Sequence, residues 1–165
     1  MQDSYTKGAD YSGQGARIGI VSARFNGRIV RAMQEAALST LLENQVAETD
    51  ISCRHVPGAF ELPLVCKAMA DTGSYDGLIA LGCVIRGDTP HFEYVSQGCT
   101  LGIQAASLQS GVPIAFGLLT TDTLKQAVVR SSGSTNKGRD AALCVLEMVN
   151  ALRAIRSSDE HSRNS

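Results

Sequence analysis

Short runs of β-branched and other apolar residues alternate along this chain with segments in which apolar residues recur every third or fourth position. The short runs predict buried strands at residues 16–23, 50–56, 77–85 and 113–120. The segments between and after them predict helices at residues 27–44, 61–71, 123–130 and 139–156, with a further helix that opens at Thr89-Pro90. Strands that alternate with helices form a parallel sheet with helices on both faces. The sequence therefore predicts an α/β fold.

The chain has the size of one ordinary domain, 165 residues. Polar stretches at residues 1–15 and 157–165 predict flexible tails on either side of a domain that spans residues 16–156. Thr89 is the expected N-cap of the helix that follows it, with Pro90 in the first helical position. Either Thr121 or Asp122 is expected to cap the helix at residues 123–130.

Composition excludes several classes of protein. Fifteen basic residues against sixteen acidic ones give a formal charge of -1, which argues against a nucleic-acid binder. No apolar stretch approaches the roughly 20 residues of a membrane helix. Five cysteines, none in a C-x-x-C pair, indicate reduced thiols in a cytoplasmic protein. No cluster has the spacing of metal ligands, so neither a metal nor another cofactor is expected.

The loops that follow the predicted strands are the candidate site, because ligands of open parallel sheets bind beyond the carboxyl ends of the strands. These loops carry RFNG, PGAFEL and RGDTPH, at residues 24–27, 57–62 and 86–91, and a fourth region runs from Phe116 to Lys137. All of the chain's phenylalanines lie at or near these loops: Phe25, Phe60, Phe92 and Phe116. Such rings could stack on a flat heteroaromatic ligand, although core packing is the alternative for each of them.

The RGDTPH segment combines backbone amides with the start of a helix, and both favour a bound anion. His91 lies in the first turn, where the helix dipole favours the neutral imidazole that can accept or relay a proton. Its alternative role is that of a polar residue at a helix end. Arg130 and Lys137 could contact a phosphate or could be solvated charges at a helix terminus.

The final predicted helix has an apolar arc wider than one face of a sheet requires. Its main stripe and the flanking residues are Ala141, Val145, Met148, Leu152 and Ile155, with Ala142, Leu146 and Val149 beside them. The arc indicates either a thoroughly buried helix or a subunit interface.

Several segments of the chain together resemble the 6,7-dimethyl-8-ribityllumazine synthases of riboflavin biosynthesis. The matching segments are ARFN (23–26), VPGAFELP (56–63), GCVIRGDTPHFEYV (82–95), FGLLTTDTLKQA (116–127) and NKGRDAA (136–142). The resemblance implies a three-layer α/β/α sandwich with a four-stranded parallel, flavodoxin-like sheet. It also implies condensation of 5-amino-6-(D-ribitylamino)uracil with 3,4-dihydroxy-2-butanone 4-phosphate, with release of phosphate and water and without a cofactor.

The resemblance assigns roles to residues of this chain. It implies that Phe25 stacks on the pyrimidine ring, that Asn26 contacts the ribityl chain, and that His91 transfers protons. Phe116 and Arg130 are implied to come from a neighbouring subunit, with Arg130 on the phosphate, Asp140 orienting it and Lys137 close to the site. The other implied substrate contacts are Gly58, Ala59, Phe60 and Glu61 for the pyrimidine and ribityl groups, Cys83, Val84 and Ile85 for the ring pocket, and Gly87, Asp88 and Thr89 for the phosphate.

Members of the family assemble as homopentamers, and some build icosahedral capsids of pentamers. The turn RSSGSTNKG (130–138) is a residue shorter than the common family form, at a place that lies near pentamer contacts in the family. Riboflavin synthase is a candidate protein partner. Two further functions stay open: an oligomeric scaffold or flavin-type binder without turnover, and a flavodoxin-like flavin carrier.

Overall fold

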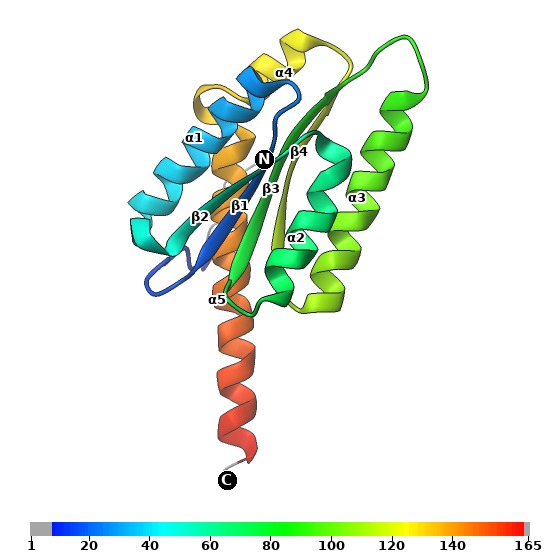
Figure 1. The fold of residues 1–165 in the computed structure, drawn as a ribbon. Helices are drawn as coiled ribbons and strands as arrows, with labels where there is room; N and C mark the ends of the chain where they lie inside the picture. Colours follow the sequence, from blue (N-terminus) through cyan, green and yellow to red (C-terminus); the bar gives the residue numbers. More distant parts are fainter. Residues whose placement is uncertain (1–7, 164–165) are drawn as a thin grey trace.

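The computed structural model describes residues 8–163, with side chains up to residue 159, and centres on one sheet (Figure 1). The sheet has four parallel strands in the order β2-β1-β3-β4. The strands are β1 (Ile18–Ala23), β2 (Ile51–Val56), β3 (Gly77–Ile85) and β4 (Ile114–Thr121). They lie within a residue or two of the predicted runs. The carboxyl ends of all four strands therefore lie at the same end of the sheet, where the candidate loops were expected.

Helices cover both faces of the sheet, which confirms the predicted three-layer α/β/α architecture. One face carries α1 (Gly27–Glu43) and α5 (Lys137–Arg163), and the other carries α2 (Leu62–Asp71) and α3 (His91–Ser110). The short helix α4 (Leu124–Arg130) follows β4, and 3-10 turns lie at Glu48–Asp50, Ala59–Glu61 and Gly133–Thr135. Within residues 8–163, no helix is long and apolar enough to cross a membrane.

Side chains of the central strands alternate between two separate cores. Ile18 and Ile20 of β1 belong to the core under α1 and α5, whereas Val21 and Ala23 belong to the core under α2 and α3. Successive strand residues point to opposite faces, so one continuous apolar run serves both layers. This explains why β1 is buried along its whole length.

Two helix caps differ from the predictions. Thr89 is not an N-cap: α3 begins at His91, Pro90 occupies the cap position, and no side chain caps the helix. Thr123, rather than Thr121 or Asp122, caps α4 by accepting a hydrogen bond from the Gln126 amide at 3.2 Å. Thr121 is unsuited to the role because it is buried and its hydroxyl donates to the Thr123 carbonyl.

The final helix is longer than predicted, since it spans residues 137–163 instead of 139–156. No glycine or proline follows residue 156 to stop it, and its later turns project from the body of the molecule (Figure 1). Of the predicted N-terminal tail, residues 1–7 lie outside the described residues, as do residues 164–165. Residues in the described part of that tail contact the domain: the Gly13 amide donates to the Asn44 carbonyl, and Asn150 donates to the Asp10 and Ser12 carbonyls.

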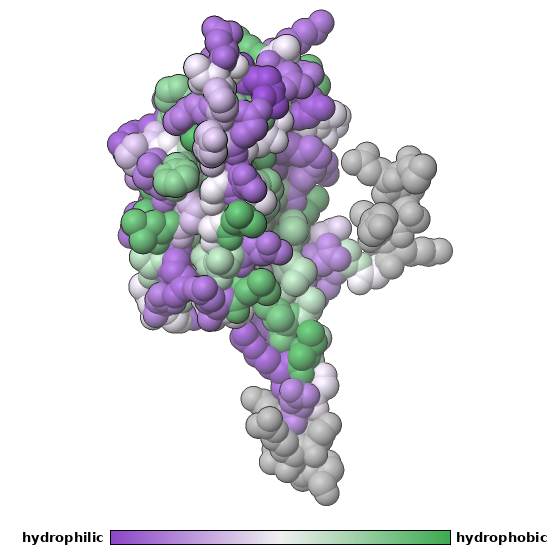
Figure 2. All heavy atoms as spheres, turned by 90° about the vertical axis from the view of Figure 1, so that its right-hand side faces the viewer, coloured by the Kyte–Doolittle hydropathy of each residue, from purple (hydrophilic) through white to green (hydrophobic). Residues whose placement is uncertain are grey.

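The apolar arc of α5 is buried only in part. Val145, Leu146 and Val149 pack into the core, while Met148 is 42% exposed and Ile155 is 59% exposed. In Figure 2, apolar side chains continue from the body of the molecule onto this projecting helix. The alternative of a thoroughly buried helix is therefore wrong for the isolated chain.

Candidate active site

A cavity of about 720 Å³ lies at the carboxyl ends of the strands, against the 3-10 turn Ala59–Glu61 and the start of α3. This volume is typical of a small-molecule site. The residues on its wall that the sequence predicted are Phe25, Gly58, Ala59, Phe60, Glu61, Cys83, Val84, Ile85, Gly87, Thr89 and His91. The structure thus brings into one cavity residues from three loops that are far apart in the sequence.

Two aromatic rings at this cavity are exposed to solvent instead of packed in a core. Phe25 is 70% exposed and Phe60 is 61% exposed, so core packing is excluded for both in this chain. Phe60 lies on the turn before α2, and its ring rests against Gly98 of α3, where an added methyl group would come within 2.6 Å of Cε2. An exposed aromatic face beside an apolar pocket is suited to stacking on a flat ligand.

The loop that carries Phe25 is attached to its neighbours by backbone hydrogen bonds. The Arg24 amide donates to the Val56 carbonyl at 2.8 Å, and the Phe25 amide donates to the Pro57 carbonyl at 3.1 Å. Asn26 does not line the cavity, because its side-chain amide donates to the Cys83 carbonyl. The loops after β1 and β2 therefore form one connected wall.

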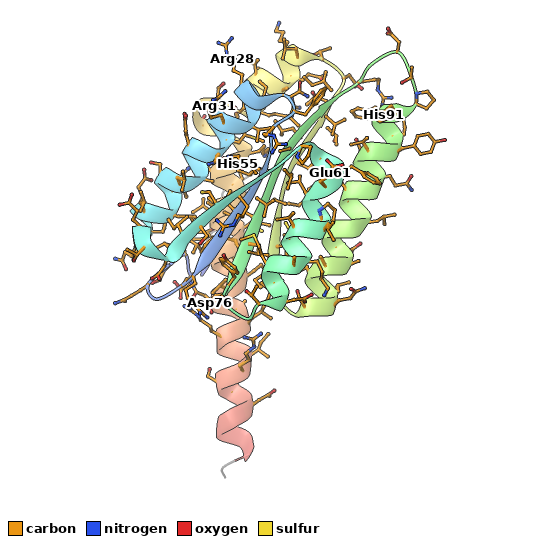
Figure 3. The ribbon with its side chains drawn as sticks, in the orientation of Figure 1. Arg28, Arg31, His55, Glu61, Asp76 and His91 are labelled. Carbon is orange, nitrogen blue, oxygen red and sulfur yellow. The ribbon has the colours of Figure 1, made fainter. Side chains whose placement is uncertain are left out.

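Glu61 closes the turn that carries the PGAF residues. Its Oε2 accepts a hydrogen bond from the Gly58 amide at 2.9 Å. Figure 3 labels Glu61 next to α2. Among the described residues, its Oε1 has no hydrogen-bond partner, and the residue lines the cavity. This carboxylate can hold its own loop with one oxygen and accept a ligand hydroxyl with the other.

The start of α3 offers free backbone donors. The Glu93 and Tyr94 amides bond to the Pro90 carbonyl, while the His91 and Phe92 amides have no partner among the described residues. Gly87, Thr89 and His91 line the cavity beside them. Asp88 is exposed and absent from the cavity wall, which removes a carboxylate from the path of a bound anion. Free amides and the helix dipole together favour a phosphate here.

A second group of predicted residues lies elsewhere. Phe116, Arg130, Lys137 and Asp140 line a separate hollow of about 440 Å³ at the edge strand β4. Lys137 Nζ pairs with Asp140 Oδ2 at 2.7 Å, and Arg130 donates to the Gln126 carbonyl. Phe116 is 47% exposed on this edge. Within one chain, the structure does not bring this group into the cavity that His91 lines.

The thiol of Cys83 at the cavity is a poor nucleophile. Burial raises its pKa from the ordinary 9.0 to about 11, so the neutral thiol dominates near pH 7. The remaining buried thiols, Cys66 and Cys99, have pKa values raised to about 12, chiefly by burial. No group of metal-ligating side chains occurs among the described residues.

Sequence reasoning did not assign Tyr94 and Val95 to the site, although both line the cavity. They lie three and four positions after His91, so they share its face of α3. Helical spacing from His91 is the signal that could have found them. Tyr94 is 71% exposed and adds a fourth aromatic side chain to the wall, beside Phe25, Phe60 and Phe92.

The chain matches the family model described as 6,7-dimethyl-8-ribityllumazine synthase over residues 15–153. This range includes all four strands and every residue of both groups described above. The match covers most of the chain, so the chain belongs to this family of transferase-type enzymes. The match also supports lumazine synthase activity in riboflavin biosynthesis.

Proposed function

We propose that this member of the family condenses 5-amino-6-(D-ribitylamino)uracil with 3,4-dihydroxy-2-butanone 4-phosphate. The observation that carries the proposal is the cavity in which open aromatic rings lie beside a helix N-terminus with free amides. One substrate is a flat ring and the other ends in a phosphate, so each finds a matching surface in the same cavity.

The pyrimidine would lie between the rings of Phe25 and Phe60, over the apolar floor of Cys83, Val84 and Ile85. The backbone at Gly58 and Ala59 would contact its polar edge. Glu61 Oε1 would accept hydrogen bonds from ribityl hydroxyls. Asn26 would contribute to ribityl binding indirectly, by holding its loop in place, since its side-chain amide donates to the Cys83 carbonyl.

The phosphate would lie at the start of α3, against Gly87, Thr89 and the free amides of the first turn, with Asp88 in the same loop. His91 would carry the proton transfers from its position at the cavity wall. The amine nitrogen of the pyrimidine attacks the ketone and loses water to form a Schiff base. Phosphate elimination and tautomerisation follow, and ring closure releases a second water. Much of the rate would come from holding two substrates together.

Completion of the site would require a second copy of the chain. Phe116, Arg130, Lys137 and Asp140 lie at the β4 edge, apart from the His91 cavity. In a homo-oligomer, such as a pentamer, that edge of one copy would close the cavity of the next. Arg130 would then hold the phosphate, with Asp140 orienting it and Lys137 nearby. The exposed Met148 and Ile155 of α5 are consistent with such an interface. We extend the same proposal to a cytoplasmic location and to riboflavin synthase as a protein partner.

Phosphate release and lumazine absorbance, measured with both substrates on the wild type and on Arg130→Ala, test the reaction. Turnover that collapses in Arg130→Ala supports both the reaction and the phosphate contact. His91→Ala should slow turnover less than Arg130→Ala, because positioning contributes more than proton transfer. A folded wild-type oligomer without turnover would instead favour a scaffold or flavin-type binder, and a flavin carrier would copurify with a yellow cofactor.

Mixing tests whether two copies share a site. If His91 and Arg130 of one site come from different chains, dissociating and reassembling His91→Ala with Arg130→Ala places both defects in some sites and neither in others. The reassembled mixture should then be more active than either variant alone. Activity that never exceeds the better variant would contradict a shared site.

A further inference from the structure

Arg86, the first residue after β3, connects three elements at the edge of the cavity. Its amide donates to the Thr121 carbonyl at 2.9 Å, which extends the pairing of β3 with β4 by one residue. Its Nε donates to Asp122 Oδ1 at 2.8 Å, just beyond β4. Its second guanidinium nitrogen bonds to Glu93 Oε1 in the first turn of α3.

The guanidinium also lies over the ring of Phe92, with 4.2 Å between its central carbon and the ring centroid. This distance is within the range of a cation–π contact. Phe92 is itself part of the cavity wall, whereas Arg86 is not. Arg86 therefore contacts the two residues that follow His91 without itself lining the cavity.

The loop between these contacts carries the proposed phosphate site. Gly87 and Thr89 lie between Arg86 and the first turn of α3, and both line the cavity. Fixing both ends of this short loop restricts where its amides and the His91 side chain can lie. Restricting these groups before the substrate arrives lowers the cost of ordering them on binding.

Charge gives Arg86 a second effect. Glu93 lies in the first turn of α3, close to the amides that would face the phosphate. A carboxylate there repels a phosphate dianion, and its pairing with Arg86 offsets that repulsion. Asp122 is paired with the same guanidinium. Loss of Arg86 would leave two carboxylates without their partner near the anion site.

We propose that Arg86 is a positioning residue that sets the affinity of the enzyme for its phosphate-bearing substrate. It acts by holding the loop of Gly87 and Thr89 between β4 and α3 and by neutralising Glu93. This role rests on the proposed function. If the ion pairs of Arg86 were only structural, loss of Arg86 would lower the stability slightly and change the KM values of both substrates to the same extent.

The test compares the KM of each substrate in Arg86→Ala, Arg86→Lys and the wild type. In Arg86→Ala, we expect the KM for the butanone phosphate to rise by about threefold to tenfold, the effect of one charge contact between partly exposed groups. The KM for the ribitylaminouracil should change less than about twofold. Arg86→Lys keeps the charge but loses the fork that reaches both carboxylates, so its KM should fall in between.

Adding Glu93→Gln to Arg86→Ala separates charge from geometry. The double variant should recover a large part of the lost affinity for the butanone phosphate, because the repelling carboxylate is gone. The matched control is Arg17→Ala, which removes another exposed arginine paired with a carboxylate, Asp76, at the opposite end of the sheet. It should leave both KM values unchanged.

Inorganic phosphate, titrated by calorimetry into the wild type and Arg86→Ala, keeps this role separate from the proposed reaction. If the wild type shows no turnover but binds phosphate more tightly than Arg86→Ala does, the proposed reaction is overturned and the role of Arg86 is supported. Turnover in which both KM values rise together, or in which Glu93→Gln restores nothing, would overturn the role of Arg86 while the reaction stands.

Discussion

The side-chain amide of Asn26 donates a hydrogen bond to the backbone carbonyl of Cys83 at 2.8 Å, across 57 positions of sequence. Asn26 precedes the first residue of α1 and has a φ of 54°, in the left-handed region where asparagine is tolerated better than most residues. This bond attaches the Phe25 loop to the strand that forms the floor of the cavity. The geometry of the ring pocket therefore depends on a residue that does not line it.

Replacing Asn26 tests this dependence. Asn26→Ala loses the hydrogen bond and also places alanine in a left-handed conformation, so it should cost about 2 kcal/mol of unfolding free energy. Asn26→Gly keeps the backbone conformation and loses only the bond, for about 1 kcal/mol. Urea unfolding measures both. Equal losses in the two variants would show that the backbone conformation carries no strain.

Much of the fold follows from local signals in the sequence. The strand predicted at 77–85 matches β3 at both ends, because a continuous apolar run is typical of a central parallel strand. Helix ends were harder to place. Thr123 caps α4 although Thr121 and Asp122 were equally good candidates by residue type. Thr121 is buried, and Asp122 is bonded through its side chain to Arg86, and the sequence shows neither contact.

The cavity was largely predictable because parallel strands bring their carboxyl-terminal loops to one edge. The sequence could not separate the two groups of residues in space. Phe116 lies within the edge strand β4 and Arg130 ends the helix after it, and both line a different hollow from Phe60, which follows the opposite edge strand β2. The hydrogen bond from Asn26 to Cys83 could not be predicted from the sequence either, since it joins residues 57 positions apart.

Gly98 controls where the Phe60 ring lies. A methyl group at this position would be 2.6 Å from Phe60 Cε2, closer than van der Waals contact, and the exposed ring would have to move. Gly98→Ala should therefore raise the KM for the ribitylaminouracil by about threefold to tenfold, the cost of a lost aromatic contact. Thermal stability should hold or increase, because alanine favours a helix interior.

Gly27→Ala is the matched control for Gly98, since a methyl group there meets nothing within 4 Å. Its KM should stay at the wild-type value. If Gly98→Ala binds the pyrimidine normally while the enzyme stays folded, Phe60 does not contact that substrate.

Asn136 stabilises the junction of α5 with α1. Its buried side chain donates to the Ser131 carbonyl at 2.7 Å and to the Ala32 carbonyl at 3.2 Å, and it accepts from the Gly138 amide at 2.8 Å. Asn136→Ala leaves buried partners unsatisfied and should lower the unfolding free energy by about 2–3 kcal/mol. Denaturant unfolding measures this, with the exposed Ser134→Ala as a control that should stay within about 0.5 kcal/mol.

The carboxyl group of Glu93 reports on Arg86 directly. The hydrogen bond from Arg86, together with one from its own backbone amide, lowers the pKa of Glu93 below its ordinary 4.5. A lowered folded-state pKa adds stability above the ordinary value, and this is lost as the pH falls through the folded pKa. An NMR titration should show Glu93 more than half ionised at pH 4.5 in the wild type. In Arg86→Ala its pKa should move upward, and an unchanged titration would mean that the pair does not form in solution.

Thiol chemistry tests whether Cys83 has a covalent role. With a pKa of about 11, only about one Cys83 in a thousand is a thiolate at pH 8, so iodoacetamide should modify it slowly. The rate should rise about tenfold per pH unit until the pH approaches 11, whereas the unfolded chain should react at once. Peptide mapping by mass spectrometry follows this, with the exposed Cys144 labelled first.

Cys83→Ser should keep most of the turnover, because the thiol only fills space in the pocket wall. Rapid labelling of Cys83 at pH 8, or a Cys83→Ser enzyme without turnover that stays folded, would instead indicate an activated nucleophile.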